Sequence, residues 1–197
     1  DLRKQRKDGT IIRVRETARV LDDGKKEELS ILIVCEDITE SYTLSEKLSY
    51  QASHDSLTGL VNRNEFEHRA ERLISTVRQD KTIHSLCFMD LDQFKIINDT
   101  CGHTAGDELL RQVTELLQKH IRKRDTLARL GGDEFGVLME HCSLKQAHRV
   151  ASLLQQEVQE FQFSWEEHTF RIGISMGLAE ISEDNHGLAE ILKNADM

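Results

Sequence analysis

The sequence predicts an α+β fold built on an antiparallel sheet, and two observations carry this prediction. From residue 54 onward, amphipathic patterns with a helical period alternate with short apolar runs typical of strands. These segments follow the order helix, strand, helix, hairpin, helix, two strands and a final helix. The central β-α-β-β-α-β part is the ferredoxin-like plan, in which helices cover one side of an antiparallel sheet.

Composition narrows the class of protein. The chain has 197 residues, of which 38% are hydrophobic and 31% charged, as is typical of a folded globular protein. Its net charge of −9 argues against binding to a nucleic acid polymer. The four cysteines show no zinc-binding spacing, which indicates reduced thiols in a cytoplasmic protein. The chain begins without Met or a signal-peptide core, so we expect a piece of a longer protein, whose missing N-terminus could carry a membrane anchor.

Residues 1–36 predict three antiparallel strands. Asp8-Gly9 and Asp23-Gly24 are turn signals, and the run between them is rich in β-branched side chains. A third, more apolar run ends at Cys35.

Two helices are predicted next. Residues 39–53 lack turn residues and carry Leu44 and Leu48 at helical spacing. Farther on, Asn62 or Asn64 can cap a helix that runs to about Arg78. One face of this second helix carries the apolar side chains of Phe66, Ala70, Leu73, Ile74 and Val77.

A buried strand is predicted over residues 85–92, and it ends on two carboxylates. Because side chains alternate along a strand, Asp90 and Asp92 should share one face while Leu91 points to the other. Residues 94–99 then give at most two turns of helix.

The next helix is predicted to begin near Thr104. Gly102 and Gly106 break the helical pattern, and residues 104–107 resemble a capping box. Past them, one apolar stripe is formed by Leu109, Leu110, Val113, Leu116, Leu117 and Ile121.

A hairpin around residues 127–139 carries the central motif. We expect Gly131-Gly132 to be its tight turn, because glycines accept positive φ at no steric cost and leave backbone open to a ligand. Asp133 and Glu134 follow at once, which places two carboxylates at the tip. Neither could be buried cheaply unless it were paired or bound to a metal.

The remainder predicts one helix, a strand pair and a final helix. Ser143 should cap an amphipathic helix. Residues 161–165 and 168–181 predict two strands that turn at Glu166-Glu167, and the last helical pattern begins at Leu188.

The predicted topology brings carboxylates together. In a ferredoxin-like sheet the end of the first strand and the hairpin turn can lie side by side, which would bring Asp90 to Asp133 without a local basic partner. Like charges at short distance require a cation. Oxygen ligands favour Mg²⁺, with Mn²⁺ as the alternative, and such an ion can also hold substrate phosphates.

Several spaced motifs resemble the GGDEF family of diguanylate cyclases, and the resemblance covers about residues 53–197. They are residues 55–63 (DSLTGLVNR), 90–99 (DLDQFKIIND), 102–107 (GHTAGD) and 129–135 (RLGGDEF). The resemblance implies a nucleotidyl-cyclase palm that works as a homodimer, with one GTP bound to each domain. The 3′-hydroxyl of each GTP attacks the α-phosphate of the other, two pyrophosphates leave, and cyclic di-GMP forms.

The resemblance also implies roles around the phosphates. By match to the family motifs, Asp90, the carbonyl of Leu91 and Asp133 hold the metal. Asp133 also accepts the proton of the attacking hydroxyl, and Glu134 lies beside the metals. Lys95 neutralises charge on the phosphates. Gly131 and Gly132 form the floor against which GTP lies.

Guanine recognition is implied for Asn98 and Asp107. A carboxylate can accept from both the N1–H and the exocyclic amine of guanine, whereas adenine offers no such pair of donors, so this contact should select GTP over ATP. Asn98 alone could equally be a turn or cap residue. His103 matches the family but could be structural, and Phe94 could be core or ligand.

Arg122 and Asp125 form an RxxD pattern five residues before the glycines. In the family, this pattern in this register is an inhibitory site for the product, and arginine suits phosphate and guanine edges. Some members supply a further arginine from the next helix, which is replaced here by Leu153. The alternative is that Arg122 and Asp125 are only the charged end of a helix and bind no ligand.

A second resemblance covers residues 1–40. Residues 6–10 (RKDGT) and 34–40 (VCEDITE) resemble the C-terminal part of a PAS sensor domain, with an unrelated meander as the alternative. Residues 41–53 would then be a signalling linker helix. Residues 54–197 would be a GGDEF domain truncated at its C-terminus, because members continue with a helix whose Lys and Arg motif touches phosphates. We therefore expect this piece alone to be weakly active or inactive.

Two other functions remain. The first is a non-catalytic module that binds GTP or cyclic di-GMP and controls an adjacent domain, such as the EAL phosphodiesterase domain that often follows in the family. The second, a template-directed polymerase palm, is disfavoured by the small size and net acidity of the chain.

Overall fold

The computed structural model describes residues 1–21, 30–183, 188 and 191, and the chain forms two compact units, residues 1–51 and 52–197. Within the described ranges, no helix combines the length and the apolar character needed to cross a bilayer.

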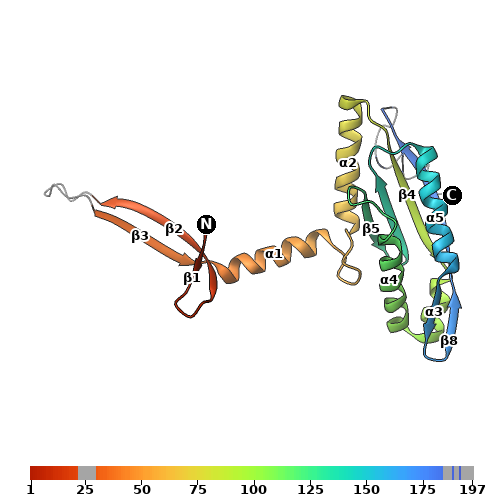
Figure 1. Ribbon diagram of the computed structural model, residues 1–197, viewed down its shortest axis with the longest axis horizontal. Helices are drawn as coiled ribbons and strands as arrows, with labels where there is room; N and C mark the ends of the chain where they lie inside the picture. Colours follow the sequence, from red (N-terminus) through yellow and green to blue (C-terminus); the bar gives the residue numbers. More distant parts are fainter. Residues whose placement is uncertain (22–29, 184–187, 189–190, 192–197) are drawn as a thin grey trace. The chain divides into compact units, whose positions relative to one another are not determined.

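The first unit contains the predicted three-stranded antiparallel meander (Figure 1). Its strands are β1 (Leu2–Gln5), β2 (Ile11–Leu21) and β3 (Ser30–Asp37), followed by the predicted helix α1 (Thr39–Ser53). The Asp8-Gly9 turn is confirmed, since the Thr10 amide donates to Asp8 Oδ1 at 2.9 Å. The second predicted turn, Asp23-Gly24, lies outside the described residues. Leu44 and Leu48 are 57% and 58% exposed on α1.

The second unit is built on a four-stranded antiparallel sheet with the order β5-β6-β4-β9. The strands are β4 (His84–Asp92), β5 (Thr126–Gly131), β6 (Glu134–Met139) and β9 (Gly173–Ile181). This order confirms the ferredoxin-like plan. The predicted strand over 168–181 is wrong in one respect: it breaks at Ile172, and its first half pairs in a separate hairpin of β7 (Gln162–Trp165) and β8 (His168–Arg171).

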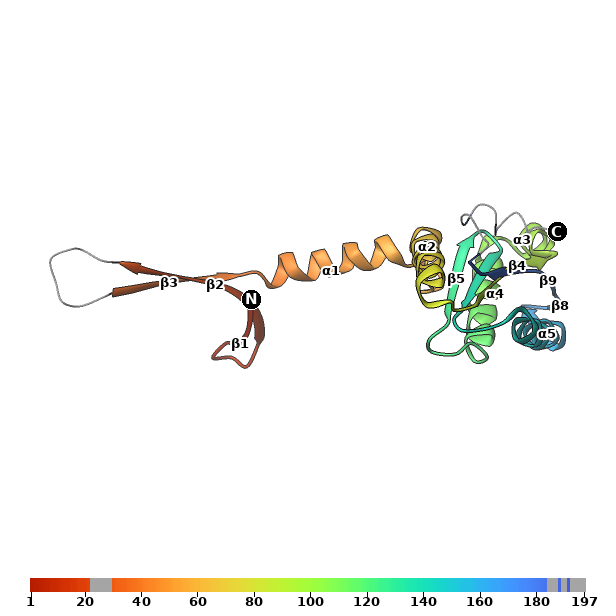
Figure 2. The same ribbon diagram turned by 90° about the horizontal axis from the view of Figure 1, so that it is seen from above.

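Helices cover both faces of this sheet. They are α2 (Arg63–Asp80), α3 (Phe94–Cys101), α4 (His103–Gln118) and α5 (Leu144–Glu160). Figure 2 shows α2 and α4 on opposite sides of β5. The expectation of helices on one side therefore holds for the central plan, and α2, which precedes that plan, covers the opposite face.

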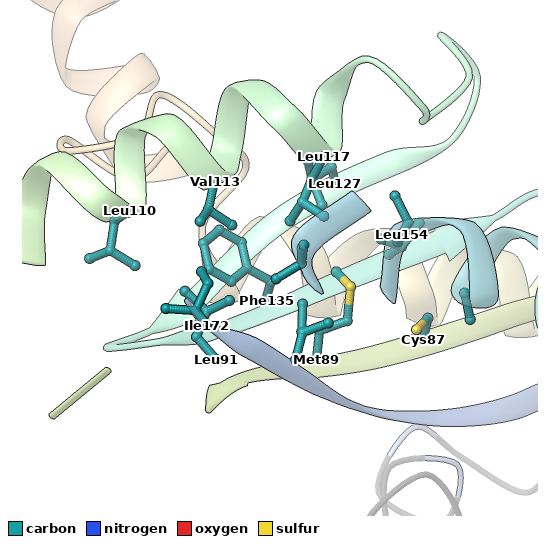
Figure 3. Close-up of a cluster of buried hydrophobic side chains, with 14 of the residues drawn as sticks. Cys87, Met89, Leu91, Leu110, Val113, Leu117, Leu127, Phe135, Leu154 and Ile172 are labelled. Atoms are coloured by element: carbon teal, nitrogen blue, oxygen red, sulfur yellow. The ribbon is translucent and has the colours of Figure 1, made fainter. Parts of the chain in front are cut away.

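Strand alternation sorts the sheet side chains into two apolar clusters. In Figure 3, Met89, Leu91 and Phe135 pack against side chains from α4 and α5, such as Val113 and Leu154. The other face packs on α2 and includes Leu86, Leu138, Phe66, Ala70 and Val77. Because Leu91 is buried in the first cluster, Asp90 and Asp92 point to the other side of the strand, as predicted.

The structure confirms two of the predicted helix caps and contradicts a third. Asn62 caps α2, since its Oδ1 accepts from the Glu65 amide at 3.0 Å. A capping box begins α5, where the Ser143 amide donates to Gln146 Oε1 at 3.0 Å. The capping box predicted at residues 104–107 is wrong: α4 begins at His103 after Gly102, with no side-chain cap. Gly106 lies inside α4 and does not interrupt it. Leu188 and Ile191 are helical, and the rest of the last helical pattern lies outside the described residues.

His84 is buried at the end of the sheet where β4 begins, with 2% of its surface exposed. Its Nδ1 accepts from the His141 amide at 2.9 Å, and its Nε2 lies 2.9 Å from Thr82 Oγ1. Because Nδ1 accepts, the ring proton of the neutral imidazole sits on Nε2. Burial and the nearby His141 lower the pKa of His84, and Glu140 opposes them only in part.

We expect this histidine to make the second unit less stable in acid. Because the pKa of His84 is lower in the folded state, the unfolded chain binds the proton more readily. The contribution of neutral His84 to the stability of the folded state is therefore present above about pH 6.5, and it is lost as pH falls through the folded pKa. The loss should lower Tm by a few degrees. Fluorescence of Trp165, the chain's one tryptophan, follows unfolding of this unit. His84→Gln should flatten the dependence between pH 7.5 and 5.5, whereas replacing the exposed His148 by Gln should keep it. Equal slopes for the two variants would contradict this role of His84.

Candidate active site at the hairpin edge

The turn between β5 and β6 is shifted by one residue from the prediction. Gly131 pairs with Glu134, so the two turn residues are Gly132 and Asp133. A register irregularity after Arg129 supplies the shift. Gly131 and Gly132 have φ of 152° and 51°, values that glycine adopts without steric cost. Asp133 therefore stands in the turn itself, and Glu134 is the first residue of β6.

The end of β4 lies beside this turn. Asp90 pairs across the strands with Glu134 on one side and Ser175 on the other, and the Leu91 amide donates to the Asp133 carbonyl at 3.3 Å. Desolvation, followed by the charges of Asp133, Glu134 and Asp92, raises the pKa of Asp90. The predicted proximity of Asp90 and Asp133 is therefore present, and it is electrostatically unfavourable without a cation.

The donor types at this edge suit a hard cation, because carboxylate and carbonyl oxygens are the ligands that Mg²⁺ prefers. However, no three His, Cys, Asp or Glu side chains in the described ranges are gathered as a ready metal site. Asp90 and Asp133 fit the predicted role. Glu134 is turned elsewhere, since its Oε2 accepts from Arg63 Nη2 at 2.7 Å.

Two arginines hold the hairpin by its backbone. Arg63 Nε donates to the Leu130 carbonyl at 2.8 Å, and Arg129 Nε donates to the Gly132 carbonyl at 3.0 Å. Arg129 also pairs with Asp55 at 3.0 Å. Partial burial opposes ionisation of Asp55, but hydrogen bonds from Thr58 and Arg129 outweigh it and lower the pKa. The segment before α2 thus braces the turn.

The sequence alone does not predict these contacts. Asp55 and Arg63 belong to one motif and Arg129 to the hairpin, but the motifs assign no role to these three side chains. One feature of the sequence points to these contacts: two arginines lie near a turn whose backbone carbonyls need hydrogen-bond donors.

The predicted guanine-reading residues lie on α3 and at the start of α4. Phe94 and Asn98 are partly buried on α3, next to Gly106 of α4. A Cβ at Gly106 would overlap Asn98 Oδ1 and lie 2.9 Å from its Cγ and 3.2 Å from Phe94 Cζ. Asn98 Oδ1 is buried and has no hydrogen-bond partner among the described residues. A buried amide oxygen without a hydrogen bond lowers the stability of the fold, so its presence is consistent with a group that accepts a hydrogen bond from a ligand.

The other predicted residues lie around this region. Asp107 is half-buried on α4, and His103 is exposed at the first position of that helix. Lys95 is exposed on the first turn of α3, three residues after β4 ends. The placement of these side chains is compatible with the predicted roles, which stay predictions.

The RxxD residues lie in the connection between α4 and β5, beside a cavity of about 270 Å³. Arg122, Lys123, Asp125 and Arg69 are among its lining residues. The Asp125 side chain is 8% exposed, and its Oδ1 accepts from the Glu140 amide at 3.1 Å. Leu153, which by the resemblance replaces an arginine of some family members, is exposed on α5.

Comparison with known proteins identifies the second unit. A family model described as "Diguanylate cyclase, GGDEF domain" matches residues 52–197. The chain is similar to the probable diguanylate cyclase DgcE of Escherichia coli K12, with 43% identity over 166 residues, which cover 84% of this chain and 15% of that protein. It is also similar to the cyclic di-GMP phosphodiesterase PdeB of Shewanella oneidensis, with 36% identity over 176 residues, which cover 88% of this chain and 20% of PdeB. The chain therefore spans at most a fifth of either relative.

A solved structure supports the fold assignment. The GGDEF domain of DgcB from Caulobacter crescentus, solved in complex with cyclic di-GMP, superposes with a TM-score of 0.70 at 26% identity. The match covers 74% of this chain and 84% of the DgcB domain. The family match begins at residue 52, where the second compact unit also begins. The chain therefore belongs to the GGDEF domain family of diguanylate cyclases.

Proposed function

We propose that this domain condenses two GTP molecules into cyclic di-GMP and two pyrophosphates. The observation that carries the proposal is the carboxylate edge, where Asp90, with its raised pKa, lies beside the turn that presents Asp133. The similarity to DgcE, whose name is probable diguanylate cyclase, supports the same activity. Incubation of the full-length protein with GTP and Mg²⁺, followed by identification of the product, tests it.

Asp90, Asp133 and the Leu91 carbonyl would hold Mg²⁺, or Mn²⁺ as the alternative. When bound, such an ion would stabilise charge on the phosphates and acidify the attacking hydroxyl. Asp133 accepts the proton of the 3′-hydroxyl as the bond from O3′ to the α-phosphorus forms and the bond to pyrophosphate breaks. Lys95 neutralises charge on the phosphates, while Gly131 and Gly132 leave backbone accessible to the nucleotide.

Asn98 and Asp107 would read the guanine edge, with Phe94 and His103 beside them. The unpaired Asn98 Oδ1 supports this assignment, because guanine offers the N–H donors that it lacks. One domain holds one GTP, so the reaction requires a second copy of the chain. A single domain with an intact hairpin should not form product.

We also propose that cyclic di-GMP inhibits the enzyme at Arg122 and Asp125. The cavity beside these residues and the fork of hydrogen-bond donors on arginine support a phosphate and guanine site. Arg122→Ala should weaken cyclic di-GMP binding by about 10- to 100-fold, as expected for removal of a charged hydrogen-bonding partner. Calorimetric titration measures it, and Arg149→Ala, an exposed arginine on α5, is the control. Unchanged affinity in the Arg122 variant would contradict the site.

The first unit is proposed to be the C-terminal part of a PAS sensor domain, and α1 the linker that pairs with its copy. The three-stranded meander and the exposed Leu44 and Leu48 support this proposal. The proposed location is the cytoplasm.

The alternative function is a non-catalytic module that binds GTP or cyclic di-GMP and acts on an adjacent EAL phosphodiesterase domain. The similarity to PdeB, which is named a cyclic di-GMP phosphodiesterase, favours keeping it. Binding of GTP without product would support this alternative.

A further inference from the structure

We propose that Arg63 is a positioning residue that holds Glu134 away from the cation-binding edge when no nucleotide is bound. The proposal rests on the proposed function, because it concerns the same edge. Glu134 is the cross-strand neighbour of Asp90, so its carboxylate could reach an ion held there. Instead, its Oε2 accepts from Arg63 Nη2 at 2.7 Å.

Arg63 is placed for this task by two contacts. It is the first residue of α2, directly after the Asn62 cap, so the helix end fixes its backbone. Its Nε donates to the Leu130 carbonyl at 2.8 Å, which anchors the guanidinium against β5. Its Nη2 then donates to Glu134, the first residue of β6. An arginine can hold a carbonyl and a carboxylate at once because its donors form a fixed fork.

The consequence concerns charge at the edge. Asp90 already experiences the charges of Asp133 and Glu134, which raise its pKa. Pairing Glu134 with Arg63 reduces this repulsion and leaves Asp90 and Asp133 as the carboxylates offered to a cation. Releasing Glu134 would add a third carboxylate, and the affinity of such sites rises with the number of charged ligands.

The test is direct titration with Mn²⁺ in the absence of nucleotide, following the free ion by electron paramagnetic resonance. Arg63→Gln should tighten Mn²⁺ binding by about three- to tenfold, because it releases a carboxylate. Arg63→Lys keeps a positive charge near Glu134 but lacks the fork that also anchors the side chain to Leu130, so it should tighten Mn²⁺ binding less than Arg63→Gln does. Arg111→Gln is the matched control. Arg111 pairs with Glu108 at 3.2 Å, with side-chain exposures of 48% and 36% against 47% and 41% for Arg63 and Glu134.

A double-mutant cycle separates release of Glu134 from simple loss of a positive charge. In a Glu134→Gln background, Arg63→Gln should change Mn²⁺ affinity by less than about twofold, because no carboxylate is released. The same tightening in both backgrounds, or no tightening in either, would overturn the proposal. Asp90→Asn should weaken Mn²⁺ binding in every background. Failure of that variant to do so would overturn the metal site and this role of Arg63 together, whereas failure of the cycle alone would leave the metal site intact.

Discussion

In the full-length protein, Asp133→Asn should abolish formation of cyclic di-GMP while leaving the domain folded. Loss of a proton acceptor alone lowers kcat by about 10²- to 10⁴-fold, and the same change also removes a proposed metal ligand. The expected loss of kcat is therefore at least about 1,000-fold. GTP consumption and product formation measure it, and fluorescence of Trp165 checks that the second unit is folded.

The chain provides a matched control for this variant. The hairpin of β7 and β8 also turns over two residues, Glu166 and Glu167, since Trp165 pairs with His168. Glu167→Gln neutralises a carboxylate in a tight turn without touching the edge at Asp90, so kcat should stay within about twofold of wild type. An Asp133 variant that kept wild-type turnover would contradict both of its proposed roles.

Gly106→Ala should impair GTP binding through Asn98. A methyl group at this position would overlap Asn98 Oδ1, so the amide must leave the place it occupies beside Phe94. Alanine favours a helix over glycine by about 1 kcal/mol, while overpacking costs about 1–3 kcal/mol, so the free energy of unfolding should fall by about 0–2 kcal/mol. Disturbing a hydrogen-bonding group of a specific site should weaken GTP binding by at least about tenfold.

Calorimetry with GTP and thermal unfolding together separate these effects. Ala105→Gly is the control, because it alters the same turn of α4 and lowers stability without adding an atom near Asn98. Its GTP affinity should stay near wild type while Tm falls. In an Asn98→Ala background, Gly106→Ala should cost little further affinity. Full GTP affinity in the single Gly106 variant would contradict the link between this glycine and guanine recognition.

Element types and order could be predicted from the sequence where the apolar periods are strong. The stripe through Phe66, Ala70 and Val77 identified α2, and the alternation at Asp90 and Leu91 placed both residues on the correct faces. The failures occur where local rules compete with tertiary packing. Gly106 resembles a helix breaker in the sequence, yet it lies inside α4. The residue is glycine there because Asn98 leaves no room for a side chain.

The sequence predicts which residues form the candidate site better than it predicts how they are arranged. Motif positions identified Asp90 and Asp133, but the one-residue shift of the turn depends on a register irregularity that spacing does not reveal. The pairing of Glu134 with Arg63 joins residues 71 positions apart, so no local pattern could predict it. The same holds for Arg129 and Asp55, which meet only because the segment before α2 runs along β5.

The most direct test of the account uses the full-length protein, incubated with GTP and Mg²⁺. We expect one cyclic di-GMP and two pyrophosphates for every two GTP consumed, a rate that rises more steeply than linearly with protein concentration, and no product from ATP. A protein that binds GTP in the presence of Mg²⁺ but forms no cyclic di-GMP would contradict the proposed activity and support a non-catalytic binding domain.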